Sequence, residues 1–551
     1  MRKYKTRKQN VTWMSWLHLK YLRILIISIT LIVMAGCTDS YLSQEVNGTL
    51  LEDKLDKIDT VQLKDHSTSS PITVEQANEQ INNHIAEPNE SKKTVSLSLD
   101  QVRAYTLEKN LDLKVELVDP AIAQQDLNVE QAKFESVFSA SADYQRSETV
   151  GTSAISKTQD YQIGFSKPIR TGGSIQVDFP FGDGNSGLAD AAASVSVIQS
   201  LLRGAGSRIN TNSIRIAAHR WNIIGARTKL TAIYLLANAD IAYWRLYSAR
   251  KELDVRNEQY KLAQNQLNNA KKKVTAGSAP KIEIVRAEAG LASRLEAVIN
   301  AETAVRSRTR DLQRIMNRDD IPLEKSVKIL TLTEPNPLGL ELDEKDLAEK
   351  AMANRMEMIE LEQLLTIDDL NIELARNDIL PDLTLNYAYS GQSQGRNVGS
   401  ALGHLTSGTF DDHSVGLSAI FPLGNEASKA RLRSARLTRI QNLARREKLQ
   451  QIIRQDVYDA VDELDKNWRR ILAAEQGVIA AERDYRVEQS QFQLGRRTST
   501  DVLFAVTRLA DAQLSKIRAF VDYEIAQINL ARATGTLLGY GQISISPVDS
   551  E

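Results

Sequence analysis

The chain of 551 residues is 42% hydrophobic and 25% charged, a balance that excludes a wholly disordered protein. Its net charge of −1 gives no indication of nucleic-acid binding. Aromatic residues make up only 6% of the chain, and long stretches rich in Ala, Leu, Gln, Arg and Glu favour long helices over a large globular core.

The first 36 residues have the pattern of a targeting signal. Seven basic and no acidic residues come before the apolar run Ile24–Met34, and small residues follow it. The run has 11 residues, which is too short to span a bilayer comfortably. We therefore interpret residues 1–36 as a signal peptide.

The only cysteine of the sequence, Cys37, directly follows Met34-Ala35-Gly36. A lone cysteine is more often a small buried hydrophobic residue. Its position here instead resembles the lipobox of bacterial lipoproteins, with Met34 at the usual leucine position. The resemblance predicts cleavage before Cys37 and lipidation of that residue, including a palmitate chain. Thr38, in place of aspartate, points by the same resemblance to the outer membrane.

The body of the chain is an internal repeat that follows a polar segment. Residues 37–94 lack steady periodicity, and we interpret them as a flexible tether. Short motifs then recur: Asp126–Glu130 as Asp369–Glu373 and Tyr144 as Tyr387, both 243 positions further on, and Gly277–Glu283 as Gly495–Asp501. The predicted domains are a first repeat at 95–320, a Pro-containing linker at 321–340, a second repeat at 341–540 and a C-terminal tail at 541–551.

Each repeat is predicted to contain a helix, strands and a long helical hairpin. Pro120 is expected to kink or split the first helix. Apolar and polar residues alternate in the candidate strands, which are 139–144 and 194–197 in the first repeat and 383–388 and 415–419 in the second. A soluble sandwich edge would show the same alternation. His404 and His413 flank a Gly/Ser-rich turn, which is interpreted as an exposed loop.

An extra hairpin in the first repeat breaks the symmetry between the two halves. Residues 161–166 and 175–179 alternate in the same way, and Gly172 and Gly173 between them can turn the chain. The second repeat has no obvious counterpart. This segment, 155–190, is expected either to add strands to the sheet or to form a hairpin at its rim.

Two long segments, 207–273 and 427–493, have apolar residues at helical spacing and contain no proline. Helices of that length are unstable alone and must pack laterally on other helices. A few strands per chain cannot close a barrel, and open sheet edges are not tolerated in lipid. If the strands lie in a membrane, several chains must therefore share one barrel.

The sequence from about 95 to 540 resembles the TolC-type outer membrane efflux family. The resemblance rests on the duplication, on the turns at Gly277 and Gly495, and on the motifs Gln199–Gly206, Leu380–Leu383 and Phe421–Gly424. It implies an α+β membrane protein in which a long α-helical coiled-coil barrel continues into a transmembrane β-barrel shared between protomers. The family's usual barrel has about twelve strands in total, and segment 155–190 puts that number in doubt here.

The same resemblance implies a homotrimer in the outer membrane that works with a periplasmic adaptor and an inner-membrane transporter. The chain would be the passive duct of a tripartite efflux or type I secretion system. Gly277, Ser278, Gly495 and Arg496 lie where the family's helical tips contact the adaptor. Arg497, Glu283 and Asp501 lie where the family has an arginine, its acidic partner and an aspartate ring at a periplasmic gate.

The alternative interpretation of the gate positions is that they are ordinary charged residues at helix ends. The runner-up for the whole chain is a periplasmic adaptor lipoprotein, which is disfavoured because an adaptor has one helical hairpin between β-domains. No catalytic constellation, cofactor motif or metal-ligand spacing is recognisable in the sequence, so an enzyme is not expected. The exported cargo is not encoded in any recognisable motif.

Overall fold

The computed structural model describes residues 94–149, 154–183, 188–405 and 411–540. The chain divides into two compact units, Met1–Asn89 and Glu90–Glu551, and the description below concerns the second unit. The predicted signal peptide, Cys37 and the predicted tether up to residue 93 lie outside the described residues, as does the predicted tail at 541–551.

Three short helices open the first repeat, as the position of Pro120 led us to expect. They are α4 (Leu99–Lys109), α5 (Leu111–Glu116) and α6 (Asp119–Ala132). Pro120 lies in the first turn of α6, where its missing N–H leaves no helical bond unmade. The prediction that Pro120 splits the helix is therefore confirmed. The second repeat opens with α10 (Glu344–Asn354) and α11 (Met356–Asn377).

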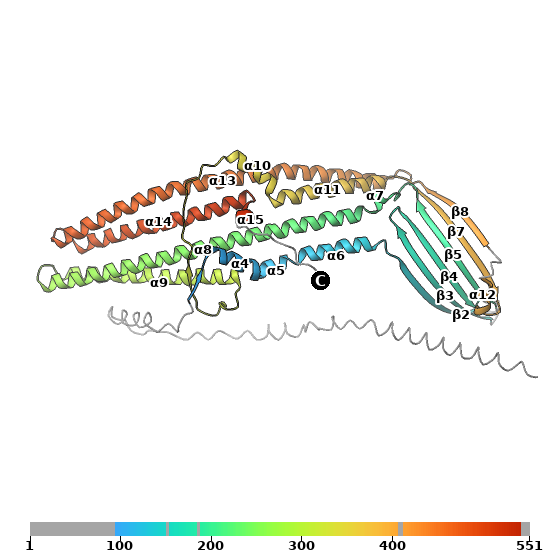
Figure 1. The fold of residues 1–551 in the computed structure, drawn as a ribbon, viewed down its shortest axis with the longest axis horizontal. Coiled ribbons are helices and arrows are strands. Elements are labelled where there is room, and N and C mark those ends of the chain that lie inside the picture. The colour runs from blue at the N-terminus through green and yellow to red at the C-terminus, as the bar shows by residue number, and fades with distance from the viewer. Residues whose placement is uncertain (1–93, 150–153, 184–187, 406–410, 541–551) are drawn as a thin grey trace, which may run out of the picture. The chain divides into compact units, whose positions relative to one another are not determined.

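Two helical hairpins dominate the second unit (Figure 1). The first joins α8 (Asn212–Thr275) to α9 (Ile282–Met316), and the second joins α13 (Glu426–Gln493) to α14 (Ser499–Ala533). With 64 and 68 residues, α8 and α13 are each about 100 Å long at the helical rise of about 1.5 Å per residue. Only the start of the first predicted helix differs, because Ser207–Asn210 form the separate short helix α7.

The long helices pack laterally, as their length requires. Helix α8 contacts α9, α14, α11 and α6, while α13 contacts α14, α11 and α10. The two hairpins also meet each other through α8 and α14. No helix among the described residues is both long enough and apolar enough to cross a membrane.

Among the described residues, one antiparallel sheet has six strands in the order β2-β3-β4-β5-β7-β8. The strands are β2 (Val137–Thr149), β3 (Ala154–Ile169), β4 (Gly173–Asp183), β5 (Ala189–Ser200), β7 (Asp382–Gly395) and β8 (Asp411–Ile420). The ladder between β5 and β7 joins the two repeats. Figure 1 shows the sheet at the opposite end of the long helices from the two hairpin turns.

The segment predicted as an extra hairpin forms β3 and β4, and both strands lie inside the sheet between β2 and β5. The expected turn at Gly172 is also present, because Gly172 has a φ of 90° and its N–H donates to Ile169 O at 3.0 Å. Of the two expected outcomes, added strands or a rim hairpin, the structure has the first.

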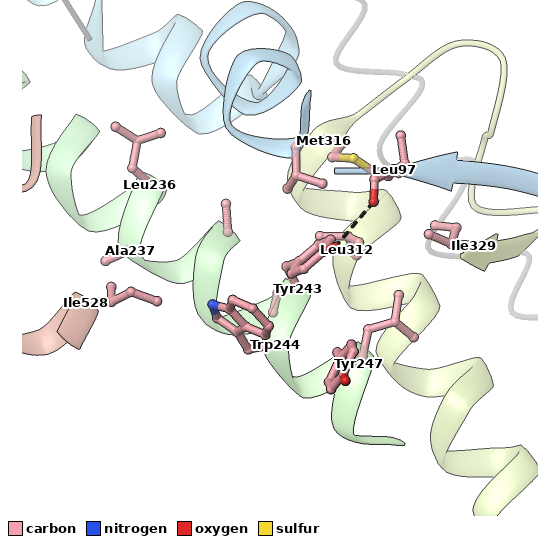
Figure 2. Close-up of a cluster of buried hydrophobic side chains, with 14 of the residues drawn as sticks. Leu97, Leu236, Ala237, Tyr243, Trp244, Tyr247, Leu312, Met316, Ile329 and Ile528 are labelled. Carbon is pink, nitrogen blue, oxygen red and sulfur yellow. Dashed lines mark hydrogen bonds between the residues drawn. The ribbon is translucent and has the colours of Figure 1, made fainter. Parts of the chain in front are cut away.

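The largest hydrophobic cluster lies where the ends of the first repeat meet (Figure 2). Tyr243 and Trp244 of α8 pack in it, and both are buried. Each large side chain that is fully buried contributes about 1.5–3 kcal/mol to stability. This burial indicates that Trp244 is a packing residue between helices. Helix α15 (Leu537–Tyr540) adds Leu537 to the cluster.

A pair of short strands holds the start of the first repeat against the linker between the repeats. Strand β1 (Thr94–Leu97) pairs in parallel with β6 (Lys328–Thr331). Leu97 and Ile329 both enter the cluster of Figure 2. The Tyr243 hydroxyl donates to Leu97 O at 3.4 Å and accepts a hydrogen bond from Thr333 N at 2.8 Å. The Pro-containing linker thus includes a regular strand.

His404 lies in helix α12 (Val398–Leu405) and His413 lies in β8, while residues 406–410 of the turn predicted between them lie outside the described residues. Ala401 of this helix is buried in a cluster with Ala189 and Ala191 of β5. The Ser393 hydroxyl of β7 donates to Ala401 O at 2.6 Å. Contacts with β5 and β7 order this Gly-rich helix, which has little helical preference of its own.

Candidate functional site

The sheet has one apolar and one polar face, because the register aligns the alternation of all six described strands. Phe138 of β2 lies opposite Phe165 of β3, which in turn lies opposite Val177 of β4. The row continues through Val195 of β5 to Tyr389 of β7. Side chains on opposite residues of a ladder share a face. The sequence prediction of one apolar and one polar face per strand is confirmed across the sheet.

Large exposed hydrophobic side chains concentrate on the apolar face. They are Phe138, Tyr144, Tyr161, Ile163, Phe165, Phe179, Val195, Leu385, Tyr387, Val415 and Leu417. The polar face is lined by short polar and acidic residues, which include Ser139, Ser141, Asp143, Asp160, Gln162, Gln176, Asp178, Ser194, Ser196, Asn386, Ser390, Gln392, Ser414 and Ser418. A sheet with these two faces suits contact with lipid on one side and with water on the other.

The two outer strands, β2 and β8, each lack a neighbour on one side within the described part of the chain. Their free backbone groups require pairing wherever water is absent. The sheet has an even number of strands, all antiparallel, so β2 and β8 run in opposite directions. The β2 edge of one copy can therefore pair in antiparallel fashion with the β8 edge of another.

The two hairpin turns have the same backbone structure, which confirms that they are equivalent points of the repeat. Gly277 and Gly495 have φ values of 70° and 73°. Ser278 N donates to Lys273 O at 2.9 Å, and Arg496 N donates to Gln491 O at 2.9 Å. This pattern closes a helix with glycine in the left-handed region. We refer to residues 276–281 and 494–498 as tip 1 and tip 2.

The hairpins also contact each other beside the tips. The carboxylate of Glu283 in α9 accepts a hydrogen bond from Ser499 N at 3.1 Å and so caps the first turn of α14. Gln266 Nε2 donates to Ser499 Oγ at 2.9 Å. Lys273 Nζ donates to Phe492 O at 2.6 Å and lies 3.7 Å from the centroid of the same ring. These contacts fix the end of one hairpin to the other.

The residues predicted for a gate lie at this end of the helices but have other nearest partners. Arg497 Nε lies 3.3 Å from Glu488 Oε2 of its own hairpin. Glu283, besides capping α14, pairs with Arg286 at 2.9 Å. Asp501 is part of a capping box with Thr498, and hydrogen bonds from the Thr498 backbone N–H and hydroxyl lower the pKa of the Asp501 carboxyl.

Sequence reasoning missed two details of tip 2. The first is the cap of α14, which is Thr498. The spacing of Thr498 and Asp501 is that of a capping box and could have indicated the correct residue. No comparable signal identifies Glu488 as the partner of Arg497, since the two lie nine positions apart on opposite sides of the turn.

Comparison with known proteins bears on the second repeat most directly. Residues 347–536 match the family model described as outer membrane efflux protein. Outer membrane protein TolC of Vibrio cholerae serotype O1 is 28% identical over 195 residues, or 35% of this chain and 43% of that protein. The probable efflux pump outer membrane protein TtgC of Pseudomonas putida is 28% identical over 265 residues, or 45% of this chain and 52% of that protein. The chain thus spans about half the length of the curated relatives it matches.

Solved structures extend the likeness of fold to most of the chain. The channel CusC superposes with a TM-score of 0.62 at 15% identity, covering 79% of this chain and 92% of that one. The Campylobacter jejuni CmeC outer membrane channel gives a TM-score of 0.62 at 14% identity, with coverage of 87% and 91%.

The second repeat thus matches the outer membrane efflux protein family, and most of the chain has the fold of solved outer-membrane channels. The two repeats each supply strands and one long hairpin, and the matched segment lies in the second of them. The first repeat contributes four of the described sheet strands and the second contributes two. The inserted hairpin β3–β4 accounts for this difference.

Proposed function

We propose that the chain is one subunit of an outer-membrane channel through which an inner-membrane transporter exports its cargo. In this proposal three copies share one β-barrel, and their helical hairpins continue the wall as a tunnel into the periplasm. The observation that carries the proposal is the six-stranded sheet, which has segregated faces, two unpaired edges and long helices at one end.

The edges of the sheet are the physical reason for expecting an assembly. A backbone N–H or C=O without a partner costs several kcal/mol in hydrocarbon. Strands β2 and β8 would each leave a row of such groups in the membrane if one copy were inserted alone. Pairing β2 of each copy with β8 of the next satisfies all six edges in three seams, and it gives every copy the same environment.

The apolar face is expected to contact lipid and the polar face to line the water-filled lumen. The names of the relatives, as outer membrane and efflux pump proteins, support this orientation and location. Lipidation of Cys37 would add an anchor at the same membrane, independently of the sheet. The barrel strands are expected to insert without it.

The tips are the proposed contact with a periplasmic adaptor. Gly277 and Ser278 of tip 1 and Gly495 and Arg496 of tip 2 are exposed at the end of the helices remote from the sheet. Because both tips have the same turn, three copies would present six similar turns to the adaptor. Arg497, Glu283 and Asp501 are the proposed gate residues just behind these turns.

The assembly is tested by unboiled gel electrophoresis of the outer-membrane fraction. We expect a heat-modifiable band that migrates as a trimer and collapses to one chain on boiling, because a closed barrel resists the detergent. A chain recovered in the outer membrane that runs only as a monomer without boiling would contradict the channel and favour the adaptor alternative. A Cys37→Ser variant serves as a control, since loss of the lipid alone should leave the trimer band.

The gate is tested by reversing the charge of Arg497. In Arg497→Glu the new carboxylate faces Glu488, which lies 3.3 Å from the native guanidinium. Repulsion between the two carboxylates should open tip 2, and planar-bilayer recordings should show leak current in the closed state. Arg496→Glu carries the same charge change one residue away and is the matched control. Equal currents in Arg497→Glu and the native protein would remove Arg497 from the gate.

A further inference from the structure

The inserted hairpin β3–β4 is paired along most of its length on both sides. Its first strand is paired with β2 from Ser166, opposite Val137, to Ala154, opposite Thr149. Its second strand is paired with β5 from Gly173, opposite Gln199, to Asp183, opposite Ala189. A hairpin that only decorated the rim of the sheet would lack one of these ladders.

The turn of this hairpin is also tied to the junction between the sheet and the helices. Gly206 N donates to Thr171 O at 2.9 Å, and Ser200 N donates to Gly172 O at 3.3 Å. Gln199 Nε2 donates to Thr171 O at 3.0 Å, and the Thr171 hydroxyl donates to Gln199 Oε1 at 2.9 Å. The turn of the hairpin therefore lies at the end of the sheet that joins the helices.

The hairpin has the same two faces as the strands beside it. Tyr161 of β3 stacks on Phe181 of β4 on the apolar face, with ring centroids 5.4 Å apart. On the polar face, Gln162 Nε2 donates to Asp178 Oδ1 at 3.2 Å. A strand pair with one apolar and one polar face belongs in a wall between lipid and water.

We infer that three copies close an 18-stranded barrel, wider than the helical tunnel alone would require. The inference rests on the proposed trimeric channel and adds the size of its outer opening. The insertion contributes two described strands per copy but no helix, so it widens the sheet and not the tunnel. The outer opening should then admit bulky hydrated solutes, and the narrowest point lies toward the tips.

Strand geometry gives the expected dimensions. With a strand spacing of about 4.8 Å and a tilt of about 40°, an 18-stranded wall has a backbone diameter of about 36 Å. The same relation gives about 24 Å for twelve strands, the number that three copies would have without the insertion. The difference is large enough to measure by imaging.

The test compares the native protein with a variant that lacks Ala154–Asp183. The deletion removes β3 and β4 as a unit, and β2 and β5 run antiparallel, so they can pair directly. Top views of detergent-purified trimers by electron microscopy should show a native wall about 1.5 times as wide as that of the variant. If the variant fails to fold, the absolute diameter of the native wall decides the question.

Polymer exclusion in planar bilayers gives a second readout. Polyethylene glycols of graded size, added on the side of the sheet, should enter the native lumen at sizes that the deletion variant excludes. A native trimer with a wall of about 24 Å would overturn the 18-stranded barrel and leave the channel intact. A native protein that forms no trimer would instead overturn the proposed function itself.

Discussion

Replacing Arg103 with leucine is expected to lower the free energy of unfolding by about 3–5 kcal/mol, because the change leaves a buried carboxylate without its partner. The Asp240 side chain is 1% exposed, and Arg103 Nη2 lies 2.8 Å from its Oδ2. Arg103 Nε also donates to Asp240 Oδ1 at 2.9 Å, so the pair is bidentate and joins α4 to α8. Thermal unfolding followed by helical circular dichroism measures the loss.

The double variant Arg103→Leu/Asp240→Leu is the matched control. It buries no charge, so its stability should return to within about 1–2 kcal/mol of the native protein. A double variant that is no more stable than Arg103→Leu would show that the loss comes from packing and not from the unpaired charge.

The pH dependence of Arg103→Leu gives an independent check of the cause. Burial raises the pKa of the Asp240 carboxyl in the native protein, and hydrogen bonding and charge attraction from Arg103 oppose that rise. Without Arg103 the folded-state pKa should rise further above the unfolded value. A carboxyl of this kind favours folding at low pH and disfavours it as pH rises through the folded pKa. The deficit of the variant should therefore be largest at neutral pH and shrink on acidification.

Gly172→Ala is expected to detach the inserted hairpin from the junction. A Cβ at this position would lie 1.9 Å from Gly204 O and 2.6 Å from Asn210 Nδ2. Its φ of 90° also lies in the left-handed region, where a side chain costs about 1–3 kcal/mol. Overpacking against a backbone carbonyl adds about 1–3 kcal/mol more. The yield of trimer on an unboiled gel and the melting temperature should both fall.

Gly206→Ala separates the cost of a strained backbone from the cost of the steric clash, both of which contribute in Gly172→Ala. Gly206 has a φ of 94°, yet a Cβ there would meet nothing within 4 Å. It therefore has the backbone strain without the clash. If both variants lose the same stability, close approach of Gly172 to Gly204 has no energetic importance.

The sequence predicted the long helices and the repeat well, because these features have long-range regularity. Helical spacing persists through the whole of α8 and α13, and the breaks at Gly277 and Gly495 have a clear cause in helix capping. The alternation of apolar and polar residues also predicted the strands and the turn at Gly172. Each strand is longer than the segment in which this alternation is clearest. Periodicity is a property of the chain itself and needs no knowledge of partners.

Contacts between distant residues were not predictable in the same way. Helix α12 contains Gly399 and Gly403 and has the composition of a turn, and its order comes from packing on β5 and β7. Glu283 caps α14 through Ser499, which lies 216 positions further along the chain. The gate residues could be located from the sequence at the tip end of the helices, but their nearest partners could not. The contact of Glu283 with Ser499 depends on how the two hairpins meet, and that of Arg497 with Glu488 depends on the path of the turn at tip 2.

The pairing of β1 with β6 has a consequence for the order of folding. Leu99 N donates to Thr333 Oγ1 across 234 positions, so the two ends of the first repeat meet in one cluster. Closing a loop of that length costs roughly 5 kcal/mol in chain entropy. The buried side chains of Leu97, Val102 and Ile329 can offset this, but only after the whole first repeat and the linker strand have been delivered. The first repeat is therefore expected to reach its final structure only after the linker that follows it has been synthesised.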